Sequence, residues 1–103
     1  AHGIEVKLDM RNVFDVLEND PTLSQHVYAV ARDLVGDKAE LRTERVMGSE
    51  DFADMAQIVP GVQCTIGHGI GPALHNPGFN FDDAFLTLGS AYYIRMVETR
   101  GAA

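Results

Sequence analysis

The sequence predicts an α/β protein in which helices pack on a sheet, with the elements in the order βαβαβα. Apolar residues alternate with polar ones in some segments and recur every three or four residues in others, which are the periods of strands and helices. Segments of the two kinds follow one another along the chain. This alternation is typical of layered α/β domains.

The first half of the chain is predicted to form a strand, a helix and a second strand. Apolar and charged residues alternate from Ile4 to Arg11, as in a strand with one exposed face. The Asn-Asp-Pro segment at 19–21 offers a cap and an initial proline for a helix that ends at Gly36. A weaker strand is expected over 39–46, where the charges are dense.

The second half is predicted to repeat the pattern. Ser49 is placed to cap a helix that stops at the Pro-Gly pair at 60–61. A short apolar strand follows at 62–66, and a glycine-rich loop covers 67–78. The last helix is expected to start near Asp82 and to place apolar residues along one side.

Composition excludes several classes of function. The chain has 103 residues, 46% of them hydrophobic, which suits one small domain. Its formal net charge of −7 opposes binding to nucleic acid or to an anionic membrane. No apolar run reaches the roughly 18 residues that a membrane span needs, and one cysteine cannot form an internal disulfide. We therefore expect a cytoplasmic protein without nucleic-acid or membrane partners.

His75 is the strongest candidate for a functional residue. It lies between a glycine-rich loop and a helix, where a neutral imidazole can bind zinc, manganese or cobalt. No HxxxH, HxH or paired CxxC pattern supplies further ligands. From spacing alone, a surface or capping role for this histidine stays open.

The other candidate site residues can each be interpreted as functional or as structural. Glu50 and Asp51 could serve as a base or an anchor near a site, but acidic residues are favourable in the first turn of any helix. The glycines at 67–71 would let the backbone turn sharply or approach a ligand closely, and their spacing does not fit a dinucleotide loop. Cys64 is expected to be a buried, inert thiol. The phenylalanines near 79–85 could line an acyl pocket or close a core.

Three motifs together resemble one enzyme family. MGSEDF at 47–52, Val-Pro-Gly at 59–61 and LHNPGFNFDD at 74–83 are similar to the C-terminal third of the metal-dependent amidohydrolases, which include hippurate hydrolases, N-acyl-L-amino-acid amidohydrolases and auxin-conjugate hydrolases. The resemblance covers nearly the whole chain. It implies a zinc-peptidase-like α/β catalytic domain that holds two divalent metal ions (zinc, manganese or cobalt), with an inserted lid domain.

The resemblance also implies roles for single residues. His75 matches the histidine of the LHNP motif and would be a metal ligand. No catalytic residue is expected in this chain, because the family's other metal ligands and its catalytic glutamate have no counterpart here. Residues that would contact substrate or support the site are Glu50, Asp51, Gly67, Gly69 and Asn76.

The missing motifs imply a C-terminal fragment of a longer enzyme. Residues 1–13 would be the last strand of the lid domain, which in this family often mediates dimerisation, 14–19 a hinge, and 20–103 the C-terminal part of the metal-binding catalytic domain. The full-length parent would hydrolyse the amide bond of hippurate-like N-acyl amino acids, whereas the fragment would be inactive and would not retain the metal pair.

Exposed edges and apolar faces would favour self-association, so a homo-oligomer is expected. Two alternatives to the enzyme stay open at this point. The chain could be a non-catalytic oligomerisation module, or a small-ligand-binding module that uses the glycine-rich loop.

Overall fold

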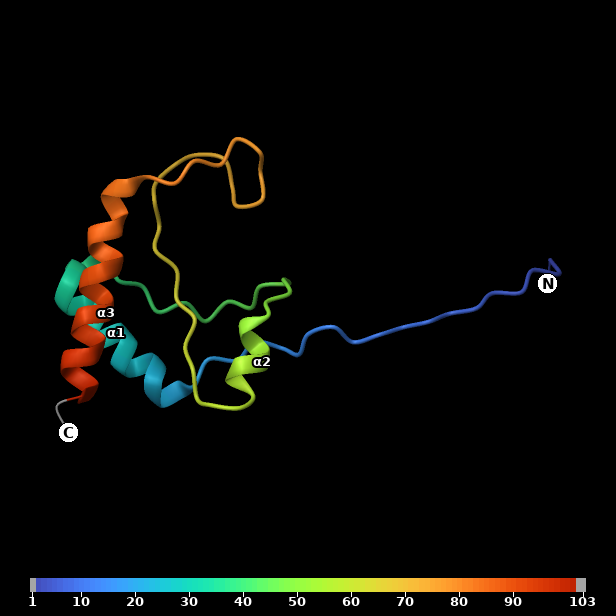
Figure 1. Ribbon diagram of the computed structural model, residues 1–103, viewed down its shortest axis with the longest axis horizontal. Helices are drawn as coiled ribbons and strands as arrows, with labels where there is room; N and C mark the ends of the chain where they lie inside the picture. Colours follow the sequence, from blue (N-terminus) through green and yellow to red (C-terminus); the bar gives the residue numbers. More distant parts are fainter. Residues whose placement is uncertain (1, 102–103) are drawn as a thin grey trace.

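The computed structural model describes residues 2–101 (Figure 1). Within them the chain forms three α-helices and two short 3-10 helices. In chain order these are α1 (Pro21–Val35), η1 (Gly36–Lys38), α2 (Phe52–Ala56), η2 (Asp83–Phe85) and α3 (Leu86–Gly101). The three helices therefore lie where the sequence predicts helices, although α2 is much shorter than expected.

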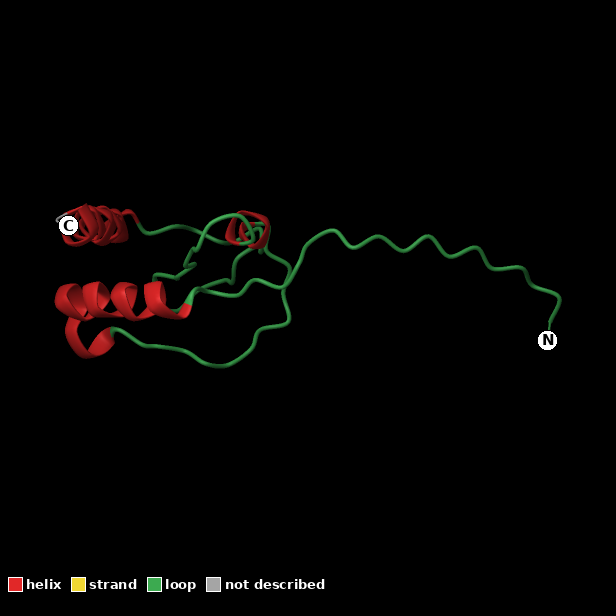
Figure 2. Ribbon diagram, turned by 90° about the horizontal axis from the view of Figure 1, so that it is seen from below, coloured by secondary structure: helices red, strands yellow, loops and turns green. Residues whose placement is uncertain are grey.

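The predicted βαβαβα arrangement is wrong. None of the residues 2–101 belongs to a β-strand, and the segments 4–11, 39–46 and 62–66 carry no strand pairing (Figure 2). A strand is stable only when its N–H and C=O groups pair with a neighbour about 4.8 Å away. An alternation of apolar and polar residues in the sequence indicates which way the side chains of an extended segment would point. It does not indicate whether a neighbouring strand is present to pair with the backbone. In the described part of the chain these segments have none.

Helix α1 begins and ends as its sequence predicts. Asp20 is the cap, its Oδ1 accepting a hydrogen bond of 2.7 Å from the Leu23 N–H, and Pro21 occupies the first helical position. Gly36 ends the helix with φ 60°, and its N–H donates to the Arg32 carbonyl. A left-handed residue at this point favours glycine because a Cβ would be strained there.

Helices α1 and α3 pack against each other. Val27 and Val30 of α1 are buried, with 8% and 4% of their surfaces exposed. At the rim of the contact, Arg95 Nη2 lies 2.8 Å from Asp33 Oδ2, and Thr99 Oγ1 lies 3.0 Å from His26 Nε2. A small apolar contact with a polar border thus joins helices that are far apart in the sequence.

The molecule is extended. Its dimensions are 66 × 37 × 20 Å and its radius of gyration is 18.8 Å, whereas a compact chain of this length has about 13 Å. Figure 1 shows why: the N-terminal segment, in blue, projects away from the helices. Among the described apolar residues only Val27, Val30 and Ala53 are buried, so most of the apolar surface faces solvent.

Candidate functional site

His75 lies in a tight turn and is exposed. Its φ is 66°, and among the described residues it is the one residue other than glycine with a positive φ. For an L-residue this conformation costs roughly 1–2 kcal/mol. Strained residues that persist are often functional, so the geometry singles out the histidine that the sequence predicts as a ligand.

Asn76 holds this turn in shape. Its Oδ1 accepts a hydrogen bond of 2.8 Å from the Gly78 N–H, and its carbonyl accepts one of 2.9 Å from the Phe79 N–H. Its own N–H donates to the Ala73 carbonyl at 3.1 Å. Asn76 therefore supports the conformation of its neighbour His75 through the loop backbone, and a part for Asn76 in binding substrate stays a prediction.

The described residues do not complete a metal site. Within 2–101, no group of three or more His, Cys, Asp or Glu side chains lies close enough together to hold a metal ion. Zinc sites generally need three or four protein ligands. His75 can offer one imidazole nitrogen, and its role as a metal ligand stays a prediction.

Glu50 is engaged with another part of the chain, away from His75. Figure 1 shows the 74–80 loop, in orange, well separated from α2. Hydrogen bonds from the Gln63 side chain and from the Phe52 N–H hold the pKa of the Glu50 carboxyl below its usual range. The Phe52 N–H lies 3.3 Å from Glu50 Oε1. Glu50, and not Ser49 as predicted, thus supplies the side-chain acceptor at the start of α2.

Three sequence motifs meet around Gln63. The Asn19 side chain bonds both backbone groups of Gln63: Nδ2 donates to the carbonyl and Oδ1 accepts from the N–H, each at 2.9 Å. Next to this pair, the Asp20 N–H donates to the Gly61 carbonyl at 3.0 Å. We call this set, together with Glu50, the motif junction. It joins the Asn-Asp-Pro, MGSEDF and Val-Pro-Gly segments.

Asn19 and Gln63 are absent from the residues that the sequence singles out as site residues. In the sequence, Asn19 is noted only as part of the Asn-Asp-Pro segment that caps a helix, and in the structure Asp20 is the cap. The remaining candidates are not brought together. Asp51 is exposed beside α2, and Gly67 and Gly69 are exposed in the loop, with φ 94° at Gly69.

An apolar hollow lies beside α3. It measures about 270 Å³ and combines side chains of the glycine-rich loop with one side of the helix. Phe81 and Phe85 line it, with His68 from the loop and Ile66 just before the loop, whereas the Phe79 ring packs edge-on against His68, with 5.1 Å between the ring centroids. His75 and Glu50 do not line this hollow, so it is separate from the candidate ligand.

Cys64 is exposed, so the prediction of a buried thiol is wrong. The segment that carries it has no sheet to cover it. Its thiol instead lies beside the Tyr92 hydroxyl, and partial burial together with the thiol hydrogen bond raises the pKa of Tyr92.

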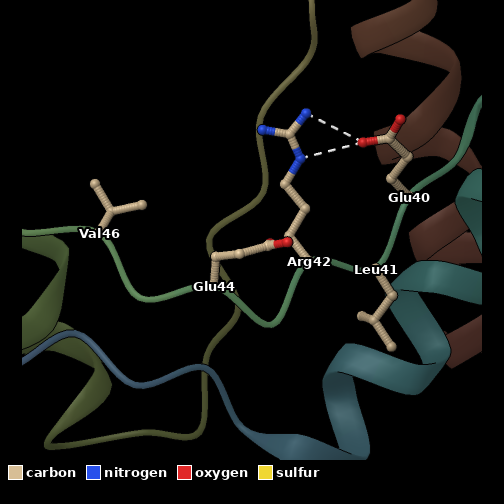
Figure 3. Close-up of a pocket in the computed structure, with 5 residues that line it drawn as sticks. All are labelled: Glu40, Leu41, Arg42, Glu44 and Val46. Carbon is tan, nitrogen blue, oxygen red and sulfur yellow. Dashed lines mark hydrogen bonds and ion pairs between the residues drawn. The ribbon is translucent and has the colours of Figure 1, made fainter.

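A second hollow follows the segment 40–46 (Figure 3). Both Nε and Nη2 of Arg42 lie 3.1 Å from Glu40 Oε2, and Leu41 extends to the other side of the backbone. The residues that line this hollow all come from the exposed segment 40–46. No residue predicted to bind metal or substrate is among them.

Comparison with known proteins settles the family. The model of peptidase family M20/M25/M40 matches residues 3–99, nearly the whole chain. The chain belongs to this family. The resemblance carried by the MGSEDF and LHNPGFNFDD motifs is therefore confirmed.

Relatives of this M20 chain are longer proteins. It is 30% identical over 97 residues to an N-acetyldiaminopimelate deacetylase from Pediococcus pentosaceus, covering 94% of this chain and 25% of the relative. It is 33% identical over 85 residues to the IAA-amino acid hydrolase ILR1-like 6 from Arabidopsis thaliana, covering 78% of this chain and 18% of the relative. A probable hydrolase from Synechocystis is 28% identical over 95 residues, covering 86% of this chain and 24% of the relative. The M20 chain thus spans about a quarter or less of these relatives.

No solved structure matches this M20 chain. In residues 2–101, none of the helices combines the length and apolar character needed to cross a membrane.

Proposed function

We propose that this chain is part of a metal-dependent hydrolase that cleaves the amide bond of N-acyl amino acids, and that His75 is one of its metal ligands. The observation that carries the proposal is the family match over residues 3–99. Two relatives are named for related chemistry, one as an N-acetyldiaminopimelate deacetylase and one as an IAA-amino acid hydrolase. Bound divalent metals would supply an activated water and polarise the amide carbonyl.

The residues of this chain would supply only some of the groups that such an active site needs. His75 offers an exposed imidazole at the tip of a turn that Asn76 holds by hydrogen bonds. The Glu50 carboxylate accepts a hydrogen bond from the Phe52 N–H, and the hydrogen bonds that lower its pKa also make it a weaker base, so we assign it a structural and not a catalytic part. A general base and the remaining ligands would come from outside these residues.

The test uses the longer protein that carries this chain. We expect His75→Ala to remove one bound metal per subunit and to lower turnover of N-acetyl amino acids and hippurate by at least about a hundredfold. Metal content by mass spectrometry and amino acid release by ninhydrin measure the two effects. His68→Ala, in the same loop, is the matched control and should keep both metals.

The residues 1–103 alone give a second, separate result. With Zn²⁺, Mn²⁺ or Co²⁺ added, we expect no release of amino acid from hippurate. If the longer His75→Ala protein kept its metals and its turnover, the role of His75 would be refuted. Hydrolysis by residues 1–103 alone would refute the division of the site between this chain and the rest of the protein.

A further inference from the structure

The loop that carries His75 is closed at its base by two aromatic rings, those of His68 and Phe79. The ring centroids are 5.1 Å apart and the ring planes meet at 86°, an edge-to-face geometry that aromatic pairs favour. Between positions 67 and 80 these two residues are partly buried, whereas every other residue is exposed. The loop is thus packed at its base and open to solvent beyond it.

His68 also connects this base with the helix that follows. Its side chain helps to line the apolar hollow, together with Phe85 of η2 and Tyr93 of α3. Figure 1 shows the loop, in gold and orange, leading into α3. Because the His68 ring both contacts Phe79 and lines the hollow, it fixes the base of the loop to the start of the helix.

Two consecutive turns form the outer part of the loop. In the first, the Asn76 N–H donates to the Ala73 carbonyl at 3.1 Å, and in the second, the Phe79 N–H donates to the Asn76 carbonyl at 2.9 Å. Asn76 belongs to both turns. The second turn ends at Phe79, so the residue that supplies a ring to the base is joined by hydrogen bonds to the turn that contains His75.

His75 occupies the third position of the first turn, with a φ of 66°. A positive φ at this position is typical of a type II turn, where glycine or asparagine is favoured. Histidine is thus held in a conformation that its Cβ disfavours, and such a conformation persists only when the surrounding structure imposes it. The two sides of the loop are also close above the base, because a Cβ on Gly78 would lie 3.5 Å from Pro72 Cγ.

We propose that His68 and Phe79 are positioning residues for His75. Their ring contact keeps the two ends of the loop together, and the closed loop holds His75 in its left-handed conformation with the imidazole exposed. The consequence for metal binding rests on the proposed function, in which His75 is a ligand. A ligand that is already held in place loses less freedom when it binds, so its metal should be held more tightly and released more slowly.

This role needs the ring of His68 and not its imidazole nitrogens. Phe79 carries no polar group, so it can contribute to the site only by packing. Within residues 2–101, His68 belongs to no group of three or more side chains that could hold a metal ion. Replacement of His68 by phenylalanine should therefore preserve the role, whereas replacement by alanine should not.

NMR of the 103-residue chain tests the loop without any metal. A positive φ brings the N–H of a residue close to its own Hα, so His75 should show a strong nuclear Overhauser effect between these protons. In Phe79→Leu and in His68→Ala, we expect the ratio of left-handed to other conformers at His75 to fall about three- to tenfold, the factor that one aromatic pair supplies. Phe79→Tyr and His68→Phe keep both rings and should retain the wild-type ratio. Phe81→Leu, which removes a nearby ring outside the pair, is the matched control and should also retain it.

Metal release from the longer protein tests the consequence for the site. His68→Ala should keep both metals, but a chromophoric chelator should remove one of them about three- to tenfold faster than from the wild type. His68→Phe should release this metal at the wild-type rate, and so should Phe81→Leu. The rescue by phenylalanine separates packing of the ring from any direct role of the imidazole.

Two results would each overturn the proposal. One is an unchanged population of left-handed His75 in Phe79→Leu. The other is metal release from His68→Phe that is as fast as from His68→Ala. The proposed function is decided by a different variant: if His75→Ala kept both metals, the role of His75 as a ligand would be wrong, whereas the NMR comparison alone decides whether the ring pair holds the loop.

Discussion

The Asn19 side chain bonds both the carbonyl and the N–H of Gln63, each at 2.9 Å. A carboxamide presents a donor and an acceptor side by side, as a backbone amide does, so it satisfies Gln63 in the way that a neighbouring strand would. The two residues are 44 positions apart in the sequence. This contact therefore fixes the start of α1 to the extended segment after α2.

We expect Asn19→Ala to lower the free energy of unfolding by about 1–2 kcal/mol, because it removes two hydrogen bonds at an exposed position. Urea denaturation measures the loss. Hydrogen exchange offers a local measurement, since the Gln63 N–H should lose its protection. Asn12→Ala, which removes only a local contact with Asp15, is the matched control and should leave the Gln63 N–H unchanged. Equal exchange in both variants would contradict the role of Asn19.

How far the fold follows from the sequence depends on whether the signal is local. The ends of α1 were predictable because Asp20, Pro21 and Gly36 act on groups within four residues of themselves. Strands depend on a distant partner, and alternation at Ile4 to Arg11 contains no information about one. For this reason the helices were placed correctly and the sheet was not.

In the candidate site, too, local features were predictable from the sequence and long-range contacts were not. LHNPG was recognisable as a turn because its glycine, proline and asparagine act locally, and Asn76 indeed bonds the Gly78 N–H. The contact between Asn19 and Gln63 was not predictable, because no spacing rule links residues so far apart. Sequence motifs therefore indicated which segments are special, while the structure was needed to show which of them meet.

Gly61 leaves room for the end of the Phe52 side chain. A Cβ at this position would lie 2.9 Å from Phe52 Cζ, closer than carbon atoms normally approach. We expect Gly61→Ala to lower the free energy of unfolding by about 1 kcal/mol relative to Gly71→Ala, since nothing lies within 4 Å of a Cβ there. Chemical denaturation of both variants measures the difference. In a Phe52→Leu background the difference should disappear, and its persistence would exclude the clash as the cause.

The motif junction should weaken in acid. Glu50 accepts hydrogen bonds from the Gln63 side chain and the Phe52 N–H, which lower its pKa from the usual 4.5. A carboxyl whose pKa falls on folding stabilises the folded state above the unfolded pKa, and this contribution is lost as the pH falls through the folded pKa. We expect protection of the Phe52 N–H against exchange to decrease in that range.

Glu50→Gln tests the origin of this acid dependence. Its amide does not titrate, so the change in Phe52 exchange between neutral and acid pH should become smaller after correction for intrinsic exchange. Glu44→Gln, on an exposed segment, is the control and should behave like the wild type. An unchanged acid dependence in Glu50→Gln would assign it to another group.

The ion pair between Arg95 and Asp33 should couple α3 to α1 weakly. Arg95 Nη2 lies 2.8 Å from Asp33 Oδ2, but both side chains are about half exposed, so solvent screens their attraction. A double-mutant cycle with Arg95→Ala and Asp33→Ala should give a coupling energy of about 0.2–1 kcal/mol that falls in 1 M salt. Urea denaturation of the four proteins measures it. Arg32 and Asp37, 3.0 Å apart beside the end of α1, provide the control, since Arg32→Ala should not change that coupling. A coupling that salt leaves unchanged would show that Arg95 acts through packing of its alkyl chain and not through its charge.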